Sequence, residues 1–132
     1  EYKDYINYIE PNLEDYNYIP YSGFSINCIE DYNKKYYNWK KNFPKEYIKI
    51  DKTIDFTKPV DIWLYFDHKE KIDVTNLSKT FIDMLCNIYS NALEKEINDN
   101  KIQLRQCATS RYVDSYENSA IYYVIRQRNV DK

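Results

Sequence analysis

Hydrophobic and polar residues alternate most clearly near the middle of the chain, in the segment "KPVDIWLYFDH". The residues at even positions there are apolar and share one face of an extended chain: Val60, Ile62, Leu64 and Phe66. The opposite face carries Asp61, Trp63, Tyr65 and Asp67. Successive side chains of a strand point to opposite faces, so this pattern predicts a β-strand. The period of two begins earlier, in "EYIKIDKTIDF", and predicts a strand or strands through this region.

The period changes to three and four in two other segments, which predicts two main helices. From about Thr75 to Lys95, one arc is apolar: Leu77, Phe81, Met84, Leu85, Ile88 and Ala92. The opposite arc is polar: Asn76, Lys79, Thr80, Asp83 and Asn87. The earlier segment "CIEDYNKKYYNWKKNF" repeats aromatic residues at helical spacing and is followed by Pro44, which ends a helix.

The two ends of the chain complete the expected sheet. The first twenty or so residues read as an extended edge strand and a loop, and the last third contains "KIQLRQCATSRYV" and "SAIYYVIRQR" around the polar "DSYEN". We interpret the latter as a hairpin. The order predicts a single α+β domain over residues 1–132, with two main helices packed on a small mixed sheet.

Composition supports a folded chain and excludes some ligands. Hydrophobic residues make up 43% of the 132 residues, and 16 Tyr stand against 5 Phe, so many buried rings carry a hydroxyl that needs a partner. The single Gly excludes a glycine-rich phosphate loop, so we expect no nucleotide cofactor.

The net charge, the cysteines and the hydropathy indicate which partners and which cellular compartment to expect. The net charge of −2 argues against a general DNA coat but leaves room for a local basic patch. Cys28, Cys86 and Cys107 have no metal-ligand spacing and read as free thiols of a reducing compartment. No stretch has the length of a membrane span and no signal peptide is evident, so we expect a cytoplasmic protein without membrane contact.

The stretch "IDVTNLSKTFID" raises two alternatives for Asp73. The residue precedes the predicted helix, where a carboxylate accepts an otherwise unpaired backbone N–H or faces the positive end of the helix dipole. Alternatively, Asp73 and Asp83 flank one groove and bind a divalent cation together with Asp99, which the fold would have to bring close. Clustered carboxylates suit Mg2+ or Mn2+, which serve phosphate chemistry.

The motif "DVTNLSKTFIDML", followed by "INDNKI", resembles the RusA family of Holliday-junction resolvases. The family signature runs approximately D-x-D-N-L-x-K-x-x-x-D-x-L and then D-D-x-x-[VI]. The matching positions are Asp73, Asn76, Leu77, Lys79, Asp83 and Leu85, and then Asp99 and Ile102. The predicted strands and helices also follow the family's order. Thr75 and Asn98 stand where the family has aspartates, and the intervening helix is a few residues longer.

The resemblance implies a RusA-like fold and a Mg2+-dependent endonuclease that resolves four-way junctions by paired phosphodiester hydrolysis. Asp73, Lys79 and Asp99 would be catalytic, and Asp73, Thr75, Asp99 and Asp83 would surround the metal. Thr75 is a neutral, weak ligand, so Asp83 or a water would fill the gap. Lys69, Lys71, Asn76, Arg105 and Arg111 are the expected DNA contacts. The family also implies a homodimer on branched DNA in a bacterial or phage-infected cell.

Two other possibilities stay open. The chain is either a degenerate relative that binds branched DNA or a protein partner without cutting, as Thr75 and Asn98 suggest, or an interaction module with no nucleic-acid role. His68, the only histidine, is a general acid, a phosphate contact or a loop residue without chemistry.

Overall fold

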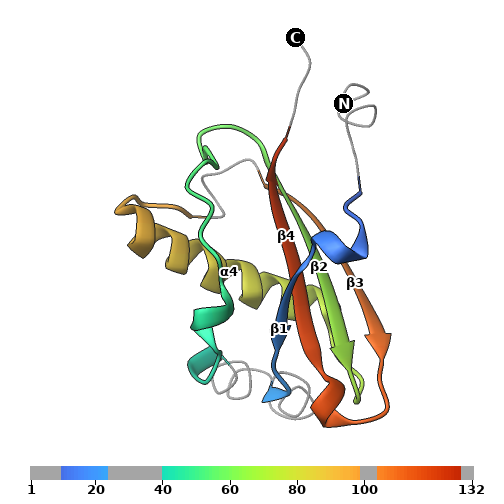
Figure 1. The fold of residues 1–132 in the computed structure, drawn as a ribbon. Coiled ribbons are helices and arrows are strands. Elements are labelled where there is room, and N and C mark those ends of the chain that lie inside the picture. Colours follow the sequence, from blue (N-terminus) through green and yellow to red (C-terminus); the bar gives the residue numbers. More distant parts are fainter. Residues whose placement is uncertain (1–9, 24–39, 99–103, 129–132) are drawn as a thin grey trace.

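The sheet is built around β2 (Val60–His68), the strand that the alternating pattern predicts. The computed structural model describes residues 10–23, 40–98 and 104–128 (Figure 1). Within them, β2 lies between β3 (Leu104–Tyr112), which runs parallel to it, and β4 (Ala120–Gln127), which runs antiparallel. The short strand β1 (Asn17–Pro20) pairs with β4, so the strand order is β1-β4-β2-β3. The α+β class, the mixed sheet and an N-terminal edge strand are confirmed.

The predicted hairpin of the last two strands is wrong. β3 and β4 are consecutive in the chain, but both pair with β2 and not with each other. The polarity of the two strands explains this sorting: β4 has a largely buried pattern, whereas β3 is mostly exposed or half-buried. A polar strand is tolerated at a sheet edge, and an apolar one gains more from a central position. The connection through η3 (Tyr116–Asn118) passes the end of β2.

The helix α4 (Val74–Leu93) covers one face of the sheet, close to the predicted bounds. It joins β2 to β3 as the crossover that two parallel strands require. Its buried side includes Leu77, Phe81, Met84 and Leu85, as predicted, while Ala92 is exposed. These side chains pack against Ile62, Leu64 and Phe66 of β2 and against Ile121 and Tyr123 of β4. Figure 1 shows α4 crossing the sheet on the side away from the viewer.

The segment between residues 45 and 57 contains no strand, which corrects the earlier start predicted for the period of two. It forms η2 (Lys45–Tyr47) and then continues as irregular chain, in which Ile48 and Ile54 are buried and most other residues are exposed. Two buried tyrosines satisfy its backbone: the hydroxyl of Tyr123 accepts from the Lys49 amide at 2.9 Å, and that of Tyr89 accepts from the Asp51 amide at 3.0 Å. Buried backbone donors need such partners, so these rings serve as hydrophobic core and as polar anchors.

Only one main helix lies within the described residues, against the two that the sequence predicts. Most of the aromatic segment between residues 28 and 43 falls outside them. Its described end is helical at Lys40 and Lys41, and the helix stops before Pro44, as predicted. No helix in the described part of the chain is long and apolar enough to span a membrane.

Candidate functional site

Asp73 is the N-cap of α4, and its carboxylate is held by one neighbour. Oδ1 accepts the backbone N–H of Asn76 at 3.2 Å, and Oδ2 accepts the side-chain amide of Asn76 at 2.6 Å. The first alternative for Asp73, a helix cap, is therefore confirmed. The residue is exposed, and each carboxylate oxygen has a second lone pair. A metal ion could still approach a carboxylate whose direction is fixed.

The other motif residues of α4 spread along the helix. Thr75 and Lys79 are exposed within its first two turns. Asp83 is also exposed, but it lies ten residues after Asp73, which is about 15 Å along a helix that rises 1.5 Å per residue. Ligand oxygens sit about 2.0–2.6 Å from Mg2+ or Ca2+. Asp73 and Asp83 therefore do not meet at one ion within this chain.

The described residue next to Asp99 lies far from Asp73. The amide of Ile97 donates to Ser90 Oγ at 2.9 Å, and that hydroxyl donates to the Ile97 carbonyl at 3.0 Å. Ser90 follows Asp73 by 17 residues, which is about 25 Å of helix. Asn98 comes directly after Ile97, and Asp99 itself lies outside the described residues. The described chain thus places Asp73 and Asn98 near opposite ends of α4.

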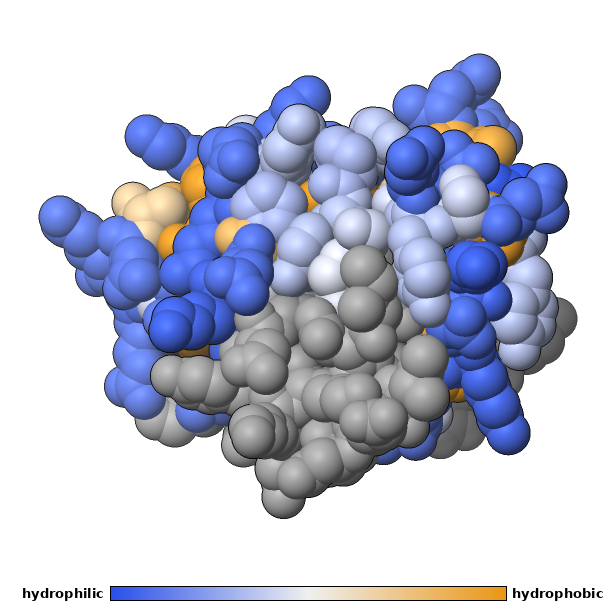
Figure 2. Space-filling view, turned by 90° about the horizontal axis from the view of Figure 1, so that it is seen from below, coloured by the Kyte–Doolittle hydropathy of each residue, from blue (hydrophilic) through white to orange (hydrophobic). Residues whose placement is uncertain are grey.

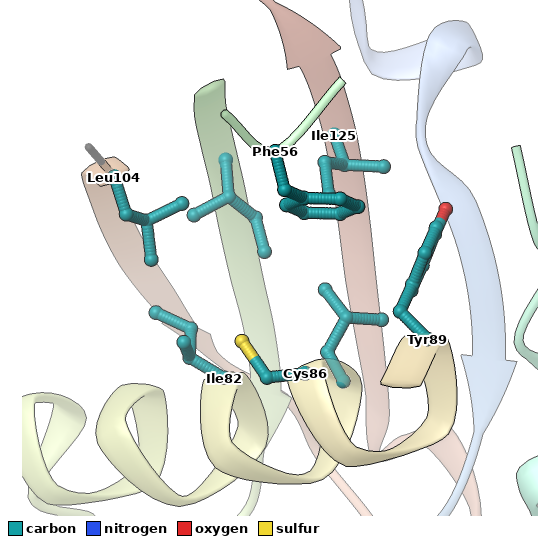
Figure 3. A pocket seen from close by; sticks show the side chains of 8 residues that line it. Phe56, Ile82, Cys86, Tyr89, Leu104 and Ile125 are labelled. Atoms are coloured by element: carbon teal, nitrogen blue, oxygen red, sulfur yellow. The ribbon is translucent and has the colours of Figure 1, made fainter. Parts of the chain in front are cut away.

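Within the described residues there is no metal-binding cluster, and the void between α4 and the sheet is small. No three His, Cys, Asp or Glu residues gather into a metal-binding group among residues 10–23, 40–98 and 104–128. A void of about 10 Å³ between α4 and the sheet is lined by Phe56, Ile82, Cys86, Leu104 and others (Figure 3). A cavity of this size barely admits a water, and its apolar lining leaves it dry. Cys86 is a buried free thiol there, and Cys107 is an exposed one.

The predicted basic residues fall into two separate groups. Lys69 and Lys71 are exposed in the loop between β2 and α4, and the Lys69 ammonium lies 4.9 Å from the centre of the Tyr116 ring. Together with Lys79 they surround the start of α4. Figure 2 views the molecule from below, and its described surface is largely hydrophilic with only small hydrophobic patches.

Arg105 and Arg111 belong to the sheet face opposite α4, which we call the outer face. Each binds an aspartate of β2 through two hydrogen bonds, Arg105 to Asp61 and Arg111 to Asp67. Hydrogen bonding to Asp67 raises the pKa of Arg111 above its ordinary value. The two arginines lie about 20 Å apart along β3 at 3.3 Å per residue. The expected basic rim is thus not continuous: Arg105 is remote from Asp73, and both guanidinium groups already bind carboxylates.

The outer face carries an aromatic feature that the sequence reasoning missed. Tyr18 of β1, Tyr122 of β4 and Tyr65 of β2 lie at paired positions of neighbouring strands and form what we call the tyrosine row. The ring centres are 5.3 Å apart between Tyr18 and Tyr122, and 5.9 Å between Tyr65 and Tyr122. The alternation around Tyr65 indicated its face, but the neighbours depend on a register that no local pattern reveals.

His68 is buried rather than a surface loop residue, with 3% of its surface exposed. Its Nδ1 lies 2.6 Å from the carbonyl oxygen of Glu70, which can only accept, so Nδ1 donates this hydrogen bond. Among the described residues, neither the buried Nε2 nor the buried Ser119 hydroxyl has a hydrogen-bond partner. Continuing the β2–β4 register by one residue sets His68 opposite Ser119. The histidine therefore holds the loop that leads to Asp73 and does not reach a substrate.

No family model, curated protein or solved structure matches the chain. The assignment of a function therefore depends on the motif and on the geometry around it.

Proposed function

We propose that the chain is a Mg2+-dependent, structure-selective DNA endonuclease of the RusA type that acts on four-way junctions as a homodimer. The observation that carries the proposal is the exposed start of α4. There, Asn76 fixes the Asp73 carboxylate, and the amine of Lys79 is exposed on the following turn. This arrangement gives the asparagine of the motif a physical role, since a ligand oxygen held in one direction loses less entropy when it binds.

The oxygen donors of the motif fit a hard divalent cation. Carboxylates at Asp73 and Asp99 and the hydroxyl of Thr75 are ligands that Mg2+ accepts, although a hydroxyl contributes less than the aspartate of the family pattern. When bound, such an ion polarises the scissile phosphate and acidifies a bound water. Lys79 neutralises charge on the phosphate, and Lys69 and Lys71 attract the backbone of the DNA.

The metal site is proposed to form between two subunits. About 25 Å of helix separates Asp73 from the turn that anchors Ile97, so one chain alone is a poor source for both carboxylates. β3 is an edge strand of nine residues whose outer side has no partner within the described sheet. Antiparallel pairing of two β3 strands about a two-fold axis sets the start of one beside the end of the other. Tyr112, at that end, pairs with His68, five residues before Asp73.

Binding without cutting is the second candidate, and one observation favours it. Both oxygens of Asp73 already accept hydrogen bonds from Asn76, and the neighbouring Thr75 supplies no charge. A site with fewer charged ligands binds Mg2+ more weakly. The protein would then hold a branched substrate or a protein partner and leave the phosphodiester intact.

The deciding experiment incubates the full chain with an end-labelled four-way junction and Mg2+ or Mn2+. Paired symmetric nicks support the endonuclease, and a retarded band without nicks supports the second candidate. If neither nicks nor a retarded band is seen, the result supports a module without a nucleic-acid role. Lys79→Ala should abolish nicking. Lys95→Ala removes another exposed lysine beyond the far end of α4 and should leave nicking unchanged. Thr75→Asp should strengthen the response to Mg2+.

Mixing two inactive variants tests the shared site. Asp73→Asn and Asp99→Asn chains are each inactive alone. In a mixed dimer with sites formed between subunits, one site loses both aspartates and the other keeps both, so single nicks return. With sites formed inside each subunit, every site lacks one aspartate and the mixture stays inactive.

A further inference from the structure

The outer face of the sheet is closed at one end and open at the other. Near the start of β2, Asp15 of η1 (Leu13–Asp15) pairs with Arg126 at 3.3 Å, and the Arg126 guanidinium lies 5.9 Å from the Trp63 ring centre. Trp63 is consequently only 3% exposed. Toward the end of β2 no described segment covers the face in this way, and Tyr18 is 52% exposed. The tyrosine row lies on this open half.

The open half combines aromatic rings with a cation. Arg111 sits at the β3 side of the row, with its guanidinium 5.6 Å from the Tyr65 ring centre and its side chain 58% exposed. Asp67 binds its Nε and Nη2, which leaves the Nη1 edge for another acceptor such as a phosphate oxygen. Burial and the Asp67 carboxylate raise the pKa of Tyr122, so its ring stays neutral and carries no charge that would repel a phosphate.

The charge of the outer face also differs from that of the chain. Its ion pairs join the four arginines Arg105, Arg111, Arg126 and Arg128 to only three aspartates. The excess of one positive charge belongs to the closed half, where Arg105, Arg126 and Arg128 face Asp15 and Asp61, and Arg111 is matched by Asp67 beside the tyrosine row. A flat sheet surface with aromatic rings beside arginines is the composition that proteins use to stack unpaired bases and to track a nucleic-acid backbone.

We propose that the tyrosine row is a binding surface for single-stranded nucleic acid, with Tyr18 as the principal stacking ring and Arg111 as the phosphate contact. This surface lies across the sheet from α4 and needs neither Asp73 nor a metal ion. In a protein that acts on branched DNA, it would hold bases that become unpaired beside the branch point. The proposal extends the proposed function and does not require that the chain cuts DNA.

The test measures the fluorescence anisotropy of a labelled 15-nucleotide oligo-dT strand, and of a duplex of equal length, titrated with the full chain in EDTA at low salt. We expect tighter binding of the single strand. Loss of one stacking ring typically costs enough affinity to weaken binding about five-fold or more. Tyr18→Ala should show that loss for the single strand only, and Tyr18→Phe, which keeps the ring, should bind within about two-fold of the wild type.

Tyr47→Ala is the matched control, because Tyr47 is 41% exposed but belongs to η2 and not to the row. Unfolding midpoints of all variants check that the fold is intact. The proposal is overturned if the wild type binds the single strand no better than the duplex, or if Tyr18→Ala and Tyr47→Ala behave alike; the row would then be a contact for a protein. The strand assay is run in EDTA, where no metal-dependent nicking occurs, so failure of the endonuclease and failure of this surface give different results.

Discussion

Replacing Asp73 separates its structural role from its proposed chemical one. Alanine removes both hydrogen bonds to Asn76 and leaves an N-terminal N–H of α4 without its cap. Loss of an N-cap costs about 1 kcal/mol, within a range of roughly 0.5–2. For a chain of 132 residues this corresponds to a fall of about 3–5 °C in Tm. We expect Asp73→Ala to show that fall in a thermal unfolding experiment without metal.

Asparagine at the same position keeps the cap and removes the charge. Asn caps helices about as well as Asp, and the lost interaction with the helix dipole is worth about 0.3–1 kcal/mol. By the same conversion, Asp73→Asn should unfold about 1–5 °C below the wild type and above Asp73→Ala, which loses the cap as well. If the carboxylate binds metal, added Mg2+ should raise the Tm of the wild type and not that of Asp73→Asn, because only a ligand of the folded state stabilises it.

Each role has its own refutation. Equal unfolding temperatures for the alanine and asparagine variants would show that the cap contributes nothing, against the geometry of Asn76. A Tm that rises equally with Mg2+ in the wild type and in Asp73→Asn would remove Asp73 from the metal site. Junction nicking retained in Asp73→Asn would do the same by an independent measurement.

Three further outcomes follow from local geometry. Glu94, beyond the end of α4, has a left-handed backbone (φ 54°), so Glu94→Gly should raise the free energy of unfolding by about 1 kcal/mol in urea titrations, and an unchanged value would contradict the strain. Hydrogen bonds from Thr53 hold the pKa of Asp51 below its ordinary value. The stability they contribute is therefore present above about pH 4 and is lost as the pH falls through the lowered pKa. Asp51→Asn should be less stable than the wild type at pH 6 and equal to it in strong acid, whereas a gap that persists in acid would assign the loss to another cause. Ser119→Ala removes a buried hydroxyl that has no partner among the described residues. This variant should be neutral or stabilise by up to about 1 kcal/mol, while a comparable loss of stability would show that His68 or a bound water pairs with the hydroxyl.

The elements that periodicity predicted were those with one consistently apolar face. α4 packs its apolar side against the sheet, and β2, although buried on both faces, turns its aliphatic residues and Phe66 toward α4; both were found close to their predicted bounds. The segment between residues 45 and 57 also alternates, but it continues as irregular chain and satisfies two of its amides through tyrosine hydroxyls. Periodicity alone cannot distinguish that arrangement from a strand.

Local sequence patterns could not predict which strands pair or which residues bind the charged side chains. A hairpin between the last two strands is the default for neighbours in the chain, and only the contrast between the polar β3 and the apolar β4 indicated otherwise. Likewise, Arg105 and Arg111 were expected to contact DNA because nothing local revealed the carboxylates of Asp61 and Asp67 opposite them. The cap at Asp73 was predictable, since it depends on residues three positions apart.

Tyr89 and Tyr123 occupy core positions where a hydroxyl is needed as well as an apolar ring. Each hydroxyl accepts a hydrogen bond from a backbone amide. A phenylalanine would fill either space almost equally well, yet it would leave the part-buried amide of Asp51 or Lys49 without this acceptor. In amide hydrogen exchange, these two positions of an irregular segment should therefore be protected as strongly as the central strand. At these two positions the preference for tyrosine over phenylalanine has a physical reason. The side-chain hydroxyl accepts the backbone hydrogen bond that a neighbouring strand would otherwise accept.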